Sequence, residues 1–188
     1  MSWEPSNCQP VDIGKNQITC EDIWNIAYGA PLSIDSTRMA AMDQNAQSAA
    51  HTPILAAKQH WLTGNPEATN QNLAEGFILG HCAGVGEPFA KEIVRAAIAA
   101  RIQVLSKGFS GCRSVVVERL QSLLNNDWLP TVPSQGSVGA AGDLAPMAYI
   151  ARRVCGFDDF KHPDFKPLVP TDKEALSLIN GISLSTAI

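Results

Sequence analysis

The chain has 188 residues, of which 45% are hydrophobic and 17% are charged, and its formal net charge at pH 7 is −4. This size and hydrophobic content suit one ordinary globular core, and the scattered Lys and Arg argue against binding to nucleic acid. No apolar run reaches the ~18 residues that a membrane span needs, and the first residues lack the basic start and apolar core of a signal peptide. We therefore expect a cytoplasmic protein without nucleic-acid or membrane partners.

The cysteines do not form a recognisable framework. They are odd in number, widely spaced and free of C-x-x-C pairs, which argues against a disulfide scaffold and against a zinc site. We expect free thiols that are buried or incidental, and no metal site. The five cysteines are Cys8, Cys20, Cys82, Cys112 and Cys155.

Apolar spacing and end signals predict a succession of helices. The expected helices cover residues 20–28, 36–50, 67–79, 87–107, 115–124, 144–154 and 173–179. Thr19 is a suitable N-cap for the first helix, and Thr171 forms a capping box with Glu174 for the last. The helix over 87–107 is apolar or alanine on nearly every side, so we expect other helices to bury it. These segments indicate a mainly α fold.

The segments between these helices are expected to be irregular. Residues 1–18 show no clear period and predict an extended or loosely ordered arm, and residues 29–35 predict a turn. Residues 156–170 hold three prolines and mixed charge, which favours an exposed excursion over a linker between domains.

One glycine-rich stretch combines a loop with the start of a helix. Residues 136–147 read G-S-V-G-A-A-G-D-L-A-P-M. Three glycines allow positive φ angles or a close approach of backbone, and Asp143 is placed to N-cap a helix that carries Pro146 in its first turn. The pattern predicts a tight loop that delivers its residues to a helix N-terminus.

This stretch closely resembles the prosthetic-group loop of the histidine and aromatic amino acid ammonia-lyases and aminomutases, whose pattern is G-S-V-G-A-S-G-D-L-A-P. Further segments match that family in the same order. They resemble G-A-x-V-S-L-D at 29–35, S-H-A-A-G-V-G at 80–86, G-x-S-G-x-R at 108–113 and N-G-T-x-x-S-T-A at 180–187. The resemblance implies that residues 1–188 form a single N-terminal unit of the family's fumarase/aspartase-like helical fold, with a loop-rich active-site region.

One position of the loop departs from the family. There the Ala-Ser-Gly triplet condenses to methylidene-imidazolone (MIO), an electrophile, when the glycine nitrogen attacks the alanine carbonyl and the serine loses its hydroxyl as water. The corresponding residues here are Ala140, Ala141 and Gly142. Because alanine has no leaving oxygen, we expect no MIO, no other cofactor and no standard MIO-dependent ammonia-lyase activity.

The resemblance also marks candidate catalytic residues. His81 matches the family's substrate-contacting histidine and Asn180 an asparagine near the prosthetic group; the alternatives are a structural histidine and a helix C-cap. The family's base tyrosine, in a Y-G-x-N-T-G loop, has no counterpart, since Tyr28 and Tyr149 lie elsewhere. His51 lies near the missing position and could transfer protons, although a solvated loop histidine is the favoured alternative. Loss of both serine and tyrosine favours natural divergence over a laboratory Ser→Ala change.

The family continues beyond these motifs into a long helical bundle. We therefore expect a partner chain with the C-terminal half, in a hetero-oligomer with a tetramer-like core; a truncated fragment is the competing explanation. The expected function is that of a split, MIO-less subunit for acid/base isomerisation, elimination or cyclisation of a small amino or carboxylic acid-derived substrate in specialised biosynthesis. The alternatives are a non-catalytic pseudoenzyme subunit and a fragment of a true ammonia-lyase with an inactivating Ser→Ala change.

Overall fold

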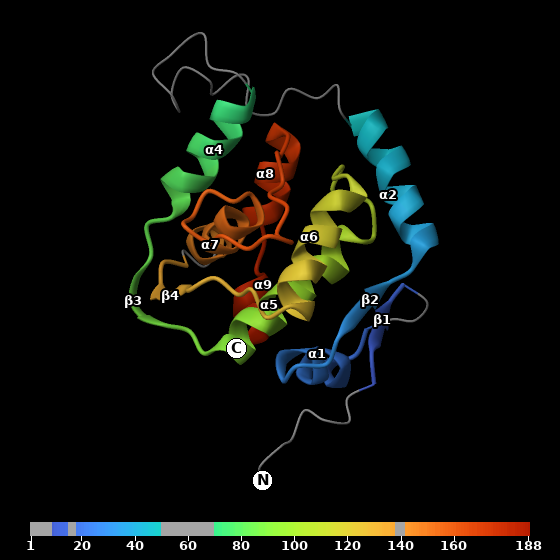
Figure 1. Cartoon of the computed structure of the whole chain (residues 1–188), viewed down its shortest axis with the longest axis horizontal. Coiled ribbons are helices and arrows are strands. Elements are labelled where there is room, and N and C mark those ends of the chain that lie inside the picture. The colour runs from blue at the N-terminus through green and yellow to red at the C-terminus, as the bar shows by residue number, and fades with distance from the viewer. Residues whose placement is uncertain (1–8, 15–17, 50–69, 138–141) are drawn as a thin grey trace.

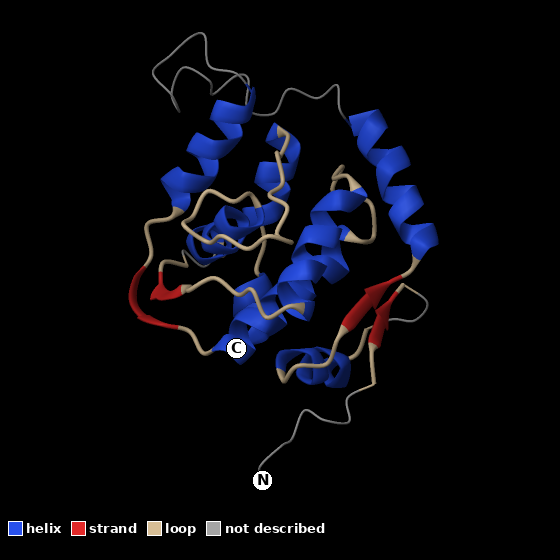
Figure 2. Cartoon of the chain, in the orientation of Figure 1, coloured by secondary structure: helices blue, strands red, loops and turns tan. Residues whose placement is uncertain are grey.

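Helices dominate the computed structural model, which describes residues 9–14, 18–49, 70–137 and 142–188 (Figures 1 and 2). The helices are α1 (Cys20–Ala27), α2 (Ser36–Ala49), α4 (Asn70–His81), α5 (Lys91–Leu105), α6 (Ser114–Asn125), α7 (Leu144–Val154), α8 (Asp172–Ile179) and α9 (Ser183–Ala187). The strands are β1 (Val11–Ile13), β2 (Leu32–Ile34), β3 (Val85–Pro88) and β4 (Pro133–Gln135). The mainly α fold is confirmed.

Helix α5 lies at the centre of the described structure. Its residues from Val94 to Ala99 are all buried, and so are Ile102 and Leu105. Helices α1, α6 and α9 pack against it. The prediction of a buried helix is confirmed, and each fully buried aliphatic side chain stabilises the fold by about 1.5–3 kcal/mol.

The predicted N-cap at Thr19 and the predicted capping box at Thr171 are both present, and Thr19 also forms a capping box, with Asp22. The Thr19 hydroxyl accepts a hydrogen bond from the Asp22 amide at 3.1 Å, and the Asp22 carboxylate accepts from the Thr19 amide at 2.8 Å. At the start of α8, Thr171 and Glu174 form the same reciprocal pair. These boxes satisfy amides that the first turn of a helix leaves without an internal partner.

A small parallel sheet replaces part of the expected arm and turn. Strand β1 pairs with β2, with Val11 opposite Leu32 and Ile13 opposite Ile34. Asn125, at the end of α6, holds this sheet by donating to the Leu32 carbonyl and accepting from the Leu32 amide, both at 2.9 Å. The predicted turn did not include the strand at residues 32–34, and the predicted arm did not include strand pairing at residues 11–13, because three-residue strands are too short to show a period and depend on distant partners.

The start of the central helix was also predicted too early. Glu87 and Pro88 belong to β3, which pairs with β4 in antiparallel orientation, and α5 begins at Lys91. The Phe89 amide donates to the Val132 carbonyl at 2.9 Å, which holds this segment extended. A proline suits a first helical turn and an edge strand alike, so the long-range pairing decides.

The segment 156–170 is more firmly anchored than an exposed excursion. Most of it is exposed, but Leu168 is buried and its amide donates to the Val154 carbonyl at 3.0 Å. The Phe165 ring meets the Trp128 ring edge-on at 5.9 Å between centroids. The segment therefore folds back over α7 (Figure 1).

The described cysteines are free thiols. Burial raises the pKa of Cys112 to about 11 and also raises the pKa of Cys155. Both therefore stay protonated and unreactive near neutral pH. Within the described ranges, no three His, Cys, Asp or Glu side chains gather as metal ligands. None of the described helices is both long enough and apolar enough to cross a bilayer.

Candidate functional site

The described end of the glycine-rich loop is a buried turn at Gly142 and Asp143. Gly142 has a φ of +86°, and a Cβ at this position would lie 2.9 Å from the Gly181 carbonyl oxygen. The Asp143 amide donates a hydrogen bond to that oxygen at 2.8 Å. Only glycine fits this conformation and this close approach, so the loop end is tied to the turn between α8 and α9.

The carboxylate of Asp143 is fully buried and binds two other segments. It accepts from the Ser137 hydroxyl at 2.8 Å and from the Ser185 amide and hydroxyl at 2.8 Å and 2.6 Å. Burial alone raises the pKa of Asp143, but the hydrogen bonds from Ser185 and Ser137 outweigh burial and leave the pKa below its ordinary value. The carboxylate is therefore an anion at neutral pH.

The prediction that the Asp143 side chain caps its own helix was wrong. Asp143 precedes α7, but its side chain makes no capping bond to that helix. Because Ser185 lies in the first turn of α9, the carboxylate stabilises the N-terminus of α9 instead. A sequence pattern reports which residue precedes a helix, and it carries no information on a turn 42 positions away.

Arg101 of α5 lies against the same turn and was missed in the sequence. Its side chain is 3% exposed, and Nη1 donates to the Asn180 carbonyl at 2.7 Å and to the Ser177 carbonyl at 3.4 Å. Gly181 has a φ of +140°, and a Cβ there would collide with Arg101 Nη2. Burial lowers the pKa of Arg101, while Cys112 and Asp143 act in the opposite direction. The available signal was an arginine within a helix that was predicted to be buried.

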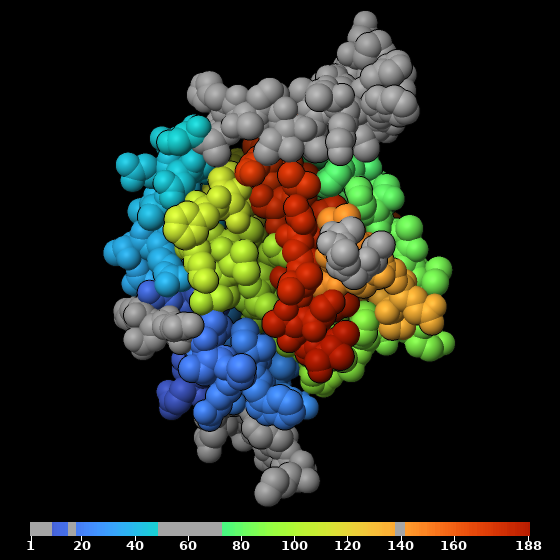
Figure 3. Space-filling view, turned by 180° about the vertical axis from the view of Figure 1, so that it is seen from behind, coloured from blue at the N-terminus to red at the C-terminus, as the bar shows by residue number. Residues whose placement is uncertain are grey.

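Together these residues form what we call the loop-end frame. It consists of Arg101, Gly142, Asp143, Asn180, Gly181 and Ser185. The frame joins α5, the glycine-rich loop and the α8–α9 turn. Figure 3 shows the red α8–α9 segment on the surface, between yellow-green residues of the central helices and the orange β4–α7 region.

Asn180 ends α8. Its amide donates to the Leu176 carbonyl at 3.0 Å, and its carbonyl accepts from Arg101. The residue is exposed, and within the part of the chain that the structure describes its side-chain amide has no hydrogen-bond partner. Asn180 is therefore a helix C-cap whose amide group remains available, and its catalytic role stays a prediction.

His81 is the last residue of α4 and lies beyond the predicted helix end at Leu79. Its Nδ1 is 2.7 Å from the Phe77 carbonyl oxygen, and its ring lies 4.6 Å from the Phe77 ring. Since a carbonyl oxygen only accepts, Nδ1 carries a proton in this contact, and Nε2 of the neutral ring keeps its lone pair. The half-buried imidazole is thus anchored on one side and able to accept a proton on the other.

The segment after His81 lies beside the start of the glycine-rich loop. Tyr149 of α7 donates to the carbonyls of Cys82 and Gly84, at 3.1 Å and 3.2 Å from its Oη. A Cβ on Gly136 would lie 3.2 Å from the Gly84 Cα. Tyr149 had no predicted role, and its hydroxyl holds the backbone that follows His81.

Comparison with known proteins assigns the family. The sequence profile of the aromatic amino acid lyase family matches residues 18–188. The chain belongs to this family. Histidine ammonia-lyase from Burkholderia mallei (strain NCTC 10229) is 33% identical over 201 aligned positions, which cover 95% of this chain and 40% of that protein. Histidine ammonia-lyase from Geobacillus thermodenitrificans is 41% identical over 130 positions, which cover 62% of this chain and 26% of that protein.

Solved structures agree with this assignment. Tyrosine aminomutase from Streptomyces globisporus superposes with a TM-score of 0.77 and 28% identity, over 95% of this chain and 38% of that one. Histidine ammonia-lyase from Trypanosoma cruzi gives a TM-score of 0.74 and 25% identity, over 95% and 39%. The helical ammonia-lyase fold is confirmed, and the chain spans about 40% of the length of its curated relatives.

In this member of the aromatic amino acid lyase family, the structure places some of the predicted site residues and does not describe others. Gly142 and Asn180 meet in the loop-end frame, and His81 lies at the end of α4 that borders the glycine-rich loop. His51, Ala140 and Ala141 lie outside the described residues.

Proposed function

We propose that this chain supplies the N-terminal part of an ammonia-lyase-like active site that works without MIO. In this proposal a second polypeptide carries the C-terminal half, and the two assemble into a hetero-oligomer with a tetramer-like core in the cytoplasm. The reaction is acid/base isomerisation, elimination or cyclisation of a small amino or carboxylic acid-derived substrate in specialised biosynthesis. Family membership supports this proposal.

The loop-end frame is the observation that carries the proposal. Its buried polar groups form specific bonds between three segments, and each such group costs about 1–3 kcal/mol when left unsatisfied. The frame ties the α8–α9 turn, which follows Asn180, to the described end of the loop, while position 141 is an alanine and not the family's serine. In this proposal the exposed side-chain amide of Asn180 and Nε2 of His81 face one cleft for a small ligand.

The proposed reaction makes no use of MIO. Ala140, Ala141 and Gly142 do not fit that group, because the side chain of Ala141 contains no oxygen that could leave as water. In the proposed chemistry Nε2 of His81 accepts a proton from the substrate and the Asn180 amide donates a hydrogen bond to its carboxylate. His51 is proposed as a second proton carrier.

A non-catalytic ligand-binding subunit is the second candidate. This candidate is favoured because both residues already have structural contacts. The His81 ring bonds to the Phe77 carbonyl at the end of α4, and the Asn180 carbonyl accepts from Arg101 at the end of α8. Binding and turnover measured on the assembled protein separate the candidates. An enzyme converts its ligand and loses this activity in His81→Ala, whereas a pseudoenzyme binds the ligand without converting it. His162→Ala, which changes an exposed histidine, is the matched control.

The assembly is tested by purifying the tagged chain from its source cells. A co-purifying polypeptide that matches the C-terminal half of the family supports the proposal. A monomer that retains no such polypeptide contradicts it.

The third reading, a true ammonia-lyase carrying an inactivating change, is tested with Ala141→Ser in the assembled protein. Appearance of the near-ultraviolet absorbance of MIO together with ammonia release from histidine or an aromatic amino acid establishes that reading. Absence of both supports the MIO-less proposal.

A further inference from the structure

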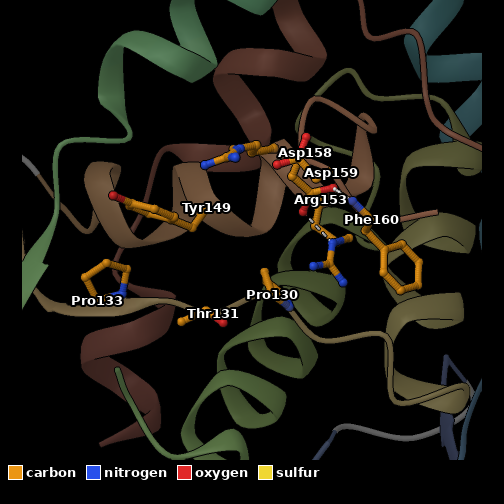
Figure 4. A pocket seen from close by; sticks show the side chains of 9 residues that line it. Pro130, Thr131, Pro133, Tyr149, Arg153, Asp158, Asp159 and Phe160 are labelled. Atoms are coloured by element: carbon orange, nitrogen blue, oxygen red, sulfur yellow. Dashed lines mark hydrogen bonds and ion pairs between the residues drawn. The ribbon is translucent and has the colours of Figure 1, made fainter. Parts of the chain in front are cut away.

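A separate pocket opens between β4, α7 and the segment after α7 (Figure 4). Its volume is about 330 Å³, at the low end of the roughly 300–1,000 Å³ typical of small-molecule sites. No residue of the loop-end frame lines it, and neither does His81. The lining residues are Pro130, Thr131, Pro133, Tyr149, Arg152, Arg153, Asp158, Asp159 and Phe160.

One wall of this pocket is internally balanced in charge. Arg153 Nε is 2.5 Å from an Asp158 carboxylate oxygen, and Arg153 Nη1 donates to the Trp128 carbonyl at 3.0 Å. The guanidinium also lies 4.2 Å from the centre of the Phe160 ring. Both charged side chains are more than four-fifths buried, with 14% and 12% exposure. This wall is therefore fixed and carries no net charge toward a ligand.

Two further charges of the pocket are not paired with each other or with the described residues. Arg152 Nε donates to the Phe157 carbonyl at 3.4 Å, but its terminal nitrogens have no ion pair in ranges 9–14, 18–49, 70–137 and 142–188. Asp159 is exposed and likewise has no ion pair in those ranges. A ligand with a single charge would satisfy one of these groups and leave the other, whereas a ligand with both charges complements the pair.

The remaining surface of the pocket is mainly apolar, with Thr131 as its further polar side chain. Figure 4 shows Tyr149 and Pro133 at one end, and Arg153 and Phe160 at the other. The Tyr149 hydroxyl is engaged by the carbonyls of Cys82 and Gly84, so the pocket meets its ring. This surface suits a short aliphatic or aromatic side chain.

We propose that this pocket binds a free amino acid in its zwitterionic form. The ligand carboxylate lies against the Arg152 guanidinium, its ammonium group faces Asp159, and its side chain packs on Tyr149 and Pro133. Because Tyr149 also holds the backbone that follows His81, the bound ligand contacts the residue that positions that segment. This site is separate from the proposed active site and does not depend on it.

The test is calorimetric titration of the full chain with three matched probes. L-norvaline carries both charges, pentanoate lacks the ammonium group, and butylamine lacks the carboxylate. We expect saturable binding of L-norvaline, and binding at least about tenfold weaker for each of the other two, since each loses one charge-assisted contact. Equal affinity for L-norvaline and pentanoate, or no binding into the millimolar range, overturns the proposal.

Variants locate the binding. Arg152→Gln and Asp159→Asn are each expected to weaken L-norvaline binding by about tenfold or more. Lys161→Gln and Asp164→Asn remove the same charges from exposed positions outside the pocket and are expected to leave the affinity unchanged. His81→Ala is also expected to bind normally, which separates this site from the proposed active site.

Retention of wild-type affinity by both pocket variants would place the ligand elsewhere and overturn the proposal. Asp159 is exposed and holds no described ion pair, so Asp159→Asn remains informative even if Arg152→Gln disturbs folding.

Discussion

The loop-end frame and the groove between α1, α5 and α9 are built in opposite ways. In the frame, a carboxylate and a guanidinium are almost completely buried and bonded to backbone from distant segments. The groove has a volume of about 410 Å³ and is lined mainly by apolar side chains that remain accessible, among them Trp24 at 57% and Ile188 at 78% exposure.

This difference indicates that the frame contributes more to the folding free energy than the groove does. Polar groups in the frame lose their hydrogen bonds when a partner is removed, and water cannot replace those bonds in the interior. Apolar groups in the groove already contact water in the folded chain, so truncating them changes little. Substitutions in the frame should therefore cost several times more than substitutions in the groove.

Replacing Asp143 tests the frame most directly. Asp143→Ala removes the acceptor of three hydrogen bonds from Ser137 and Ser185, and we expect the free energy of unfolding to fall by about 3 kcal/mol. Urea denaturation followed by circular dichroism measures this change. Asp164→Ala removes an aspartate whose side chain is 84% exposed and should change stability by less than about 0.5 kcal/mol. A loss below about 1 kcal/mol in Asp143→Ala would contradict the comparison.

Gly181→Ala tests the close approach of Arg101. Alanine at this position would have to adopt a φ of +140°, which side chains disfavour, and its Cβ would collide with the guanidinium. We therefore expect the free energy of unfolding to fall by about 2 kcal/mol. Gly76→Ala in α4 is the matched control, because a Cβ there meets no atom within 4 Å and alanine favours the helix by about 0.5–1 kcal/mol. Opposite signs in thermal melts of the two variants are the expected result; equal destabilisation would rule out a special role for the α8–α9 turn.

The dependence of stability on pH tests the buried carboxylates. Burial raises the pKa of Glu174, but hydrogen bonds from Arg113 and Thr171 outweigh it and hold the pKa below the ordinary value of 4.5. Asp143 is likewise held below 3.8. Because the unfolded chain then binds more protons than the folded chain, stability is present above these ordinary values and is lost as pH falls through the lower folded-state values.

We expect unfolding free energies measured from about pH 6 down to about pH 3 to decline, and Glu174→Gln to decline less steeply. A slope in Glu174→Gln that equals that of the wild-type chain would show that the Arg113–Glu174 pair, with atoms 2.7 Å apart, does not set it.

The sequence predicted well those features that depend on neighbouring residues. The N-cap at Thr19, the capping box at Thr171, the buried helix over α5 and the family motifs are all local patterns. Features that depend on distant segments were not predicted. Strand β1 needs β2, the Asp143 carboxylate needs Ser185, and the role of Arg101 depends on a carbonyl of Asn180. The sequence therefore indicated candidate residues of the site, but not the hydrogen bonds that join them across distant segments.

Trp24 provides the smallest expected effect and the sharpest contrast with the frame. The side chain is 57% exposed and its ring lies 4.6 Å from that of Tyr28, so Trp24→Ser removes little buried area. We expect the unfolding free energy of the isolated chain to change by less than about 0.5 kcal/mol. The measurement is the same urea titration as for Asp143→Ala, with Ile26→Ser, a fully buried position on the same helix, as the control that should be strongly destabilised. If Trp24→Ser destabilises the isolated chain as much as Asp143→Ala does, the groove contributes to the core and stability is not concentrated in the frame.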